Sequence, residues 1–211
     1  MMKFRLFGVV CALVINATPL QSHAALVGVL PETPGGTDYQ AYYDNVADLT
    51  WLANANSAGG LRSWADAMAR VDALNINGVT GWRLPDTLQP DSSCSYPYYW
   101  AGSAGLYCTG SEMGNLFYNV LGGTSHNSNY DLFSNIQPFL YWSATEVAFY
   151  PYEAWYFDFG IGAQFSYYKT YPGYAWAVHS GNAGAVPLPP ALYLFAFGLL
   201  GLLFIARKKA A

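Results

Sequence analysis

Histidine and carboxylate side chains are the groups of this 211-residue sequence that could do acid–base or metal chemistry. Beyond residue 24 the histidines are His126 and His179, and neither stands in a metal-ligand motif. Hydrolysis of a glycan would need two carboxylates on one cleft, and the sequence shows no pair at a working separation. The acids that could supply such a pair include Asp86, Asp91, Glu112, Asp131, Glu146, Glu153 and Asp158. The sequence therefore predicts no metal, no cofactor and no catalytic residue.

Cys94 and Cys108 are the other pair with possible chemistry. In an exported chain two such thiols tend to form a disulfide, and closing a loop of about fifteen residues would contribute about 3 kcal/mol. Two metal ligands are the alternative, but further Cys or nearby His at ligand spacing is lacking. The third cysteine, Cys11, lies in a leader that should be removed. We predict a disulfide between Cys94 and Cys108.

Aromatic side chains are concentrated in two stretches that could bind a sugar. Between positions 139 and 178, sixteen of forty residues are Phe, Trp or Tyr, which is too many for one core, so some should face solvent or a ligand. Sugar sites place apolar CH faces on aromatic rings carried by loops of a rigid sheet. Packing in the core is the alternative for each stretch. The candidate ligand-binding aromatics are Tyr98 and Trp100 in the loop 90–109, and Tyr152, Trp155 and Tyr156 in the second stretch.

The N-terminal residues have the pattern of a secretory signal peptide. Lys3 and Arg5 precede an apolar stretch over residues 6–15, and Ser22-His23-Ala24 supplies small residues at a cleavage site. We predict a signal peptide over residues 1–24, cleaved after Ala24, and hence an exported protein.

The C-terminal residues have a three-part pattern. The segment Val186-Pro187-Leu188-Pro189-Pro190 leads into an uncharged run over residues 191–206, which Arg207-Lys208-Lys209 closes. As a helix this run would be about 24 Å long, apolar all round and flanked by cations that stay on the cytoplasmic side. A buried core helix is the alternative. We predict a transmembrane helix.

The layout of residues 186–211 resembles the PEP-CTERM sorting signal of exopolysaccharide-producing Gram-negative bacteria, with Leu188 where that family usually has Glu. The resemblance implies a membrane protease-transpeptidase, exosortase, as processing partner. It further implies an inner-membrane intermediate and then a place at the cell surface or in the extracellular matrix.

Residues 25–185 remain as one predicted domain with room for a sizeable core. All thirteen acidic residues of the chain lie there, against the four cations Arg62, Arg70, Arg83 and Lys169, so the formal charge is four minus thirteen, or −9. Such a surface repels phosphate backbones, which excludes nucleic acid and anionic glycans as general partners.

Local patterns predict the main elements of this domain. Residues 39–43 and 48–52 should form a hairpin, and Ser63, with Asp66 three residues later, should cap a helix. A second short helix should begin after Ser111 and end at Gly122-Gly123. Alternation over residues 155–159, 165–167 and 174–178 predicts three antiparallel strands in a meander.

Five motifs, in their order, resemble the DUF1566 family, also called the Lcl C-terminal-domain family, over roughly residues 39–182. They are Asp48-Leu49-Thr50-Trp51, Ser63-Trp64-Ala65-Asp66-Ala67, Gly81-Trp82-Arg83-Leu84-Pro85, Tyr141-Trp142-Ser143-Ala144-Thr145 and Trp176-Ala177-Val178. The resemblance implies an α+β, C-type-lectin-like fold with two short helices, antiparallel sheets and a long loop region. His179 stands where the family commonly has Arg.

Members of the family are known mainly as surface or secreted modules, at least one of them a glycan-binding adhesin. We therefore expect a non-catalytic glycan- or matrix-binding module. A structural matrix protein without a discrete site is the alternative. Enzymes that act on glycans, or oxidases that use Cys94 and Cys108 as formylglycine-generating enzymes use theirs, are further alternatives. Arg83 is either a ligand-facing guanidinium or a partner of an internal carboxylate.

Overall fold

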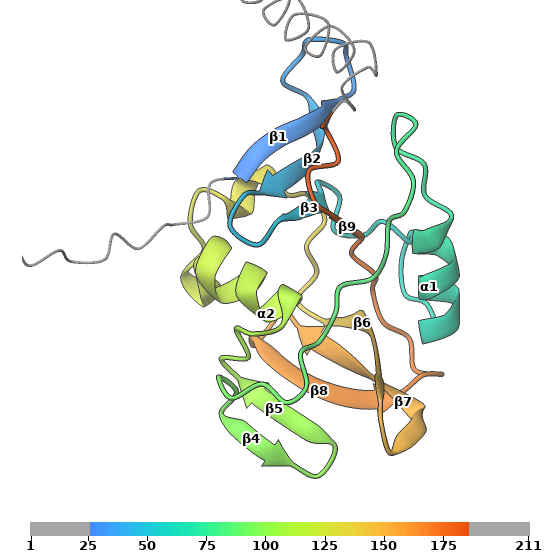
Figure 1. Ribbon diagram of the computed structural model, residues 1–211, viewed down its shortest axis with the longest axis vertical. Coiled ribbons are helices and arrows are strands. Elements are labelled where there is room, and N and C mark those ends of the chain that lie inside the picture. Colours follow the sequence, from blue (N-terminus) through green and yellow to red (C-terminus); the bar gives the residue numbers. More distant parts are fainter. Residues whose placement is uncertain (1–25, 186–211) are drawn as a thin grey trace, which may run out of the picture.

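The computed structural model describes residues 26–185, which form two antiparallel sheets and a few short helices (Figure 1). This confirms the α+β class. The predicted signal peptide, sorting motif and transmembrane run lie outside the described residues. Within residues 26–185, no helix combines the length and the apolar character that crossing a bilayer requires.

The smaller sheet has the strand order β1 (Leu26–Pro31), β2 (Tyr39–Asp44), β3 (Leu49–Leu52), β9 (Val178–Ser180). Its β2–β3 hairpin confirms the prediction. The carboxylate of Asp44 holds the connecting turn by accepting hydrogen bonds from the backbone N–H groups of Val46 and Ala47, at 2.9 and 3.1 Å.

The larger sheet has the order β4 (Tyr96–Tyr99), β5 (Gly102–Leu106), β8 (Ala163–Tyr168), β7 (Tyr150–Asp158), β6 (Leu140–Val147). The predicted reversal between β7 and β8 is confirmed. Gly162 has a φ of +72° there, and a Cβ at this position would overlap the ring of Phe117, so only glycine fits.

The prediction that residues 174–178 form the third strand of a meander is wrong. Residues 174–178 do not pair with β8; Tyr174 forms an isolated bridge to Tyr141, and Val178 starts β9 beside Trp51 in the smaller sheet. The reason is the indole of Trp176, which is fully buried and donates a 2.7 Å hydrogen bond to the carbonyl oxygen of Leu52. This segment therefore passes from one sheet to the other.

Both predicted helices are present. α1 (Trp64–Asp72) begins at Ser63, whose hydroxyl accepts a hydrogen bond from the backbone N–H of Asp66, as predicted. α2 (Glu112–Asn115) continues as the π-helical turn η1 (Leu116–Val120), and the short 3₁₀ turns η2 (Gly123–Ser125) and η3 (Tyr130–Leu132) follow.

α2 begins after Ser111, as predicted, but the Ser111 hydroxyl does not cap the helix; it accepts a 3.0 Å hydrogen bond from the backbone N–H of Leu88. The glycine within this helix has a packing reason. A Cβ at Gly114 would overlap the carbonyl oxygen of Cys108, so the helix can approach the disulfide loop only with glycine there.

A single principal core joins the two sheets. It includes Trp51 of β3, Trp142 of β6 and Phe157 of β7. Figure 1 shows the sheets at opposite ends of the domain with α1 and α2 on either side between them. Five of the seven tryptophans are no more than 1 % exposed: Trp51, Trp82, Trp142, Trp155 and Trp176.

Candidate functional site

Four aromatic side chains from three elements form a continuous row, which we call the aromatic strip. It consists of Trp100 from the β4–β5 turn, Tyr150 and Tyr152 from β7, and Tyr168 from β8. The ring centroids are 4.8 Å apart for Trp100 and Tyr150, and 5.8 Å for Tyr150 and Tyr152. Those of Tyr152 and Tyr168 are 5.7 Å apart, with the ring planes only 21° from parallel.

The aromatic strip is a surface feature. Trp100, Tyr152 and Tyr168 are 53 %, 52 % and 54 % exposed, although tryptophan and tyrosine usually bury most of their area. Tyr150 is half-buried because it also packs against a small core cluster around Trp155. The strip is therefore anchored on the core through Tyr150, while its other rings remain exposed. Exposed aromatic rings of this kind can pack against a ligand that has apolar faces.

Strand pairing and one lysine position the tyrosines. Glu153 of β7 lies opposite Tyr168 of β8, and the backbone N–H of Lys169 donates a 3.0 Å hydrogen bond to the carbonyl oxygen of Tyr152. The Lys169 ammonium donates to the carbonyl oxygen of Pro151 at 2.6 Å and pairs with Glu146 at 2.8 Å. The Pro151–Tyr152 segment is thus tied to β6 and β8.

The same ammonium lies 4.5 Å from the ring centroid of Trp64, a cation–π contact. Trp64 in turn donates a 2.8 Å hydrogen bond from its indole N–H to the carbonyl oxygen of Ser143 in β6. The first residue of α1 therefore also supports the segment that carries Tyr152.

The hairpin that carries Trp100 is held at its base by the disulfide between Cys94 and Cys108, which confirms the predicted pair. The buried carboxylate of Asp91 accepts hydrogen bonds from the backbone N–H groups of Ser93 and Gly110, both at 3.0 Å. Asp91 and the two sulfur atoms lie close together, but cysteines joined in a disulfide present no thiolate to a metal.

The phenol of Tyr152 is uncharged at neutral pH. The pKa of Tyr152 is raised above its ordinary value of 10.0, first by desolvation and then by the charge of Glu153 and the neighbouring phenols. The Glu153 carboxylate itself is buried and accepts a 2.7 Å hydrogen bond from the hydroxyl of Ser166.

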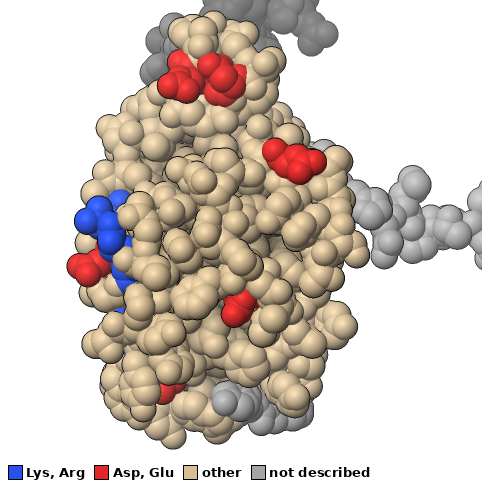
Figure 2. Space-filling model, turned by 180° about the vertical axis from the view of Figure 1, so that it is seen from behind, with Lys and Arg blue, Asp and Glu red and all other residues tan. Residues whose placement is uncertain are grey.

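Charged side chains are sparse elsewhere on the surface as well. On the face shown in Figure 2, basic side chains gather at one margin and acidic side chains are scattered. Large areas therefore carry no charge.

The predicted ligand residues fall into different environments. Trp100 and Tyr152 lie in the strip. Tyr156 is half-buried, with its ring 6.4 Å from that of Trp142 and 6.5 Å from that of Phe165. The side chain of Tyr98 lies outside the described part of the chain.

The assignment of Trp155 to the ligand surface is wrong, because this residue is 1 % exposed and packs with Ala104 and Val147 beneath the β4–β5 hairpin. Its alternation with Phe157, which is also buried, was the signal that could have placed it in the core. Tyr168 was not predicted as a site residue, because its neighbour in the strip, Tyr152, comes from another strand.

Arg83 pairs with an internal carboxylate, the second of the two predicted alternatives. Its guanidinium contacts both carboxylate oxygens of Glu112, at 2.8 and 2.7 Å, and the hydrogen bond raises the pKa of Arg83. Asp86 lies 3.3 Å away, and desolvation raises the pKa of its carboxyl. This cluster joins the segment before β4 to the start of α2.

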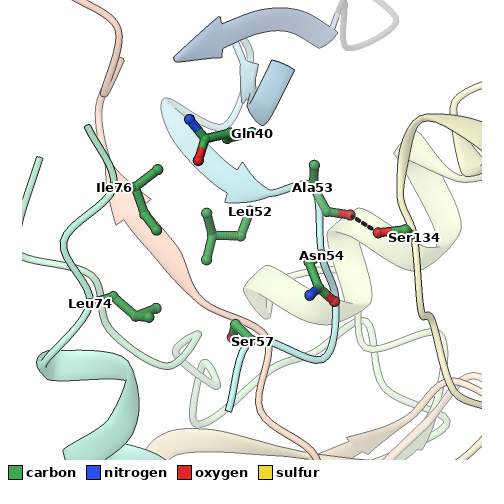
Figure 3. A pocket seen from close by; sticks show the side chains of 8 residues that line it. All are labelled: Gln40, Leu52, Ala53, Asn54, Ser57, Leu74, Ile76 and Ser134. Atoms are coloured by element: carbon green, nitrogen blue, oxygen red, sulfur yellow. Dashed lines mark hydrogen bonds between the residues drawn. The ribbon is translucent and has the colours of Figure 1, made fainter. Parts of the chain in front are cut away.

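A pocket of about 260 Å³ lies beside the smaller sheet (Figure 3). Its two hydroxyl groups are hydrogen-bonded to the backbone. The hydroxyl of Ser57 donates to the carbonyl oxygen of Ala175, and that of Ser134 donates to the carbonyl oxygen of Ala53. The lining side chains include no acid, base or nucleophilic cysteine: Gln40, Leu52, Ala53, Asn54, Ser57, Leu74, Ile76 and Ser134.

Two further pockets lie away from the strip. One of about 420 Å³ is an apolar groove beside α1 that includes Trp64, Met68 and Trp82. The other, of about 160 Å³, includes His126 and Tyr130, whose rings stack at 3.7 Å.

Comparison with protein-family models gives a match. The family model described as the Lcl C-terminal domain matches residues 40–179, from β2 to β9, and so includes every residue of the aromatic strip. No curated protein matches the chain.

Proposed function

This chain belongs to the Lcl C-terminal domain family, and we propose that it is a non-catalytic module that binds neutral glycans of the extracellular matrix through the aromatic strip. The observation that carries the proposal is the row of four aromatic rings on the surface, joined by three ring contacts, in which Trp100, Tyr152 and Tyr168 are each more than half exposed. Aromatic rings that are exposed yet fixed in place suit the CH faces of sugars, and phenol hydroxyls suit their polar edges.

The charge of the domain favours a neutral ligand. Four cations stand against thirteen acids in residues 25–185. Two of the cations are engaged, because Arg83 pairs with Glu112 and Lys169 pairs with Glu146. An anionic polymer would meet net repulsion, whereas a neutral one would not.

The family and the disulfide indicate an extracellular domain. We further propose that the chain reaches that location with a signal peptide over residues 1–24 and a PEP-CTERM-like sorting signal over residues 186–211. In this proposal residues 191–206 span the inner membrane until exosortase processes the chain, which then resides at the surface or in the matrix of a Gram-negative bacterium.

We also propose that the fold is C-type-lectin-like. The two antiparallel sheets, the two flanking helices and the long segment without helix or strand between α1 and β4 support this assignment.

Retention on immobilised polysaccharides tests the proposal. The full-length protein should be retained on at least one neutral polysaccharide, and Trp100→Ala and Tyr152→Ala should each lower retention. Tyr96→Ala is the matched control, because Tyr96 is 60 % exposed but lies at the end of β4 away from the turn that carries Trp100. No retention of the parent, or equal retention of all variants, would favour a structural matrix protein without a discrete site. Turnover of a glycan would revive the enzyme alternative.

A further inference from the structure

We infer that the aromatic strip binds an internal stretch of an extended, unbranched neutral polysaccharide and not a terminal sugar. This inference rests on the proposed function and adds the class of glycan.

The length of the strip is the first argument. Three successive steps of 4.8, 5.8 and 5.7 Å separate the ring centroids from Trp100 to Tyr168. A row of this length exceeds one sugar ring, so a single sugar would leave much of the exposed aromatic surface uncovered. A polymer that lies along the row would cover it.

The shape of the surroundings is the second argument. Recognition of a chain end needs a concave site in which polar groups converge on one sugar. Three of the four strip residues are instead more than half exposed. An open row allows a chain to enter and leave at both ends.

The rigidity of the strip is the third argument. Tyr152 is held through Lys169, and Trp100 is carried by a hairpin whose base is closed by the disulfide Cys94–Cys108. Rings that are fixed before binding lose little conformational freedom on contact, so weak stacking contacts can add up along a polymer.

Ring contacts continue beyond Tyr168, and they set the length of polymer that this surface can hold. The ring of Tyr167 lies 5.7 Å from that of Tyr168, at an interplanar angle of 77°, and 4.6 Å from that of Tyr171. Tyr167 and Tyr171 are 42 % and 39 % exposed. We therefore expect binding to stop improving once the oligosaccharide reaches from Trp100 to Tyr171.

Titration calorimetry of the full-length protein with a size series tests this inference. The probes are hydroxyethyl cellulose, konjac glucomannan, pullulan and dextran, together with oligosaccharides, from disaccharide to hexasaccharide, of whichever polymer binds. We expect affinity to rise at least tenfold across the series and then level off, and a large excess of the monosaccharide to leave the polymer bound. Trp100→Ala and Tyr168→Ala, the first and last residues of the aromatic strip, should weaken the hexasaccharide more than the disaccharide, whereas Tyr96→Ala should weaken neither.

Equal affinity for disaccharide and polymer, or full displacement by the monosaccharide, would overturn the inference while the proposed glycan binding stands. Binding to none of the four polymers would contradict both. The two variants Trp100→Ala and Tyr168→Ala could instead weaken short and long oligosaccharides equally. That result would also overturn the inference, because it would mean that the protein binds one sugar unit and makes no further contacts along the chain.

Discussion

The ammonium group of Lys169 donates a 2.6 Å hydrogen bond to the carbonyl oxygen of Pro151. This contact joins the residue after β8 to the segment of β7 that carries Tyr152. The same ammonium pairs with Glu146 and lies over the ring of Trp64, so one side chain connects β6, β7, β8 and α1. Lys169 therefore acts as a positioning residue for the aromatic strip, although it lies outside the strip itself.

Replacing Lys169 with Met should weaken polysaccharide binding more than it weakens the fold. Met keeps most of the apolar stem but removes the contacts to Pro151 and Glu146, so we expect the free energy of unfolding to fall by about 1 kcal/mol. We expect affinity to fall severalfold, because the Pro151–Tyr152 segment would lose its side-chain contact with Lys169 and keep only the backbone hydrogen bond. Urea unfolding and calorimetry measure the two effects.

The control for this variant is Arg70→Met, which removes an exposed cation from α1. It should change neither quantity. Unchanged affinity in Lys169→Met would show that Lys169 does not position the aromatic strip for binding.

The ion pair between Arg83 and Glu112 should stabilise the fold without contributing to binding. Both side chains are largely buried, at 29 % and 19 % exposure, and they share two hydrogen bonds. Arg83→Met or Glu112→Gln alone should lower the free energy of unfolding by about 1–3 kcal/mol, because each leaves a half-buried partner unsatisfied.

A double-mutant cycle for this pair should give a favourable coupling energy, with the double variant less destabilised than the sum of the two single changes. Purely additive effects would contradict the pairing. Loss of polysaccharide binding in a variant that remains folded would instead give Arg83 a direct role in the ligand site.

The Cys94–Cys108 disulfide should contribute both to stability and to the site. Closing its loop is worth about 3 kcal/mol in the chain-entropy model, so Cys94→Ser with Cys108→Ser should lower the free energy of unfolding by about that amount. Affinity should fall as well, because the hairpin that carries Trp100 loses its fixed base. Denaturant unfolding with and without reductant checks this, since reductant should affect the parent only. Equal stability of the parent and the double variant would show that the crosslink adds nothing.

The pH dependence of binding should be flat through neutrality. The pKa of Tyr152 is raised from 10.0 by desolvation and by the charge of Glu153, so its phenol stays neutral to a higher pH than a free tyrosine does. Binding should therefore persist as pH rises to about 9 and weaken only above about pH 10, where the Tyr152 phenolate forms. Affinity measured across this range checks the expectation, and Tyr152→Phe should delay the loss. A decline centred near neutrality would mean that another group controls binding.

Local patterns identified the elements whose signals are short in range. The hydroxyl of Ser63 caps α1 as its spacing to Asp66 predicts, and the β2–β3 hairpin follows from alternation around Asp44. Residues 174–178 also alternate, yet Trp176 passes into the core between the sheets. Alternation shows that the two faces of a strand have different surroundings, but it does not show which strand pairs with it. The pairing of Val178 with β3 therefore could not be predicted from the sequence.

The site shows the same limit. The sequence placed Trp100 and Tyr152 in two separate aromatic patches, and the structure joins them through the contact of Trp100 with Tyr150. Residues fifty positions apart meet only because β5 pairs with β8. The burial of Trp155 could have been inferred from its alternation with Phe157, whereas the place of Tyr168 beside Tyr152 depends on the register of two strands.

The accessibility of Trp100 to a neutral quencher, with and without bound polysaccharide, tests the central claim most directly. Trp100 is 53 % exposed, whereas five of the other six tryptophans are buried, so acrylamide quenching of tryptophan fluorescence reports mainly on this residue. Saturating neutral polysaccharide should reduce quenching in the parent protein and have little effect in Trp100→Phe. Unchanged quenching of the parent while the polysaccharide is bound would place the ligand elsewhere and contradict the account.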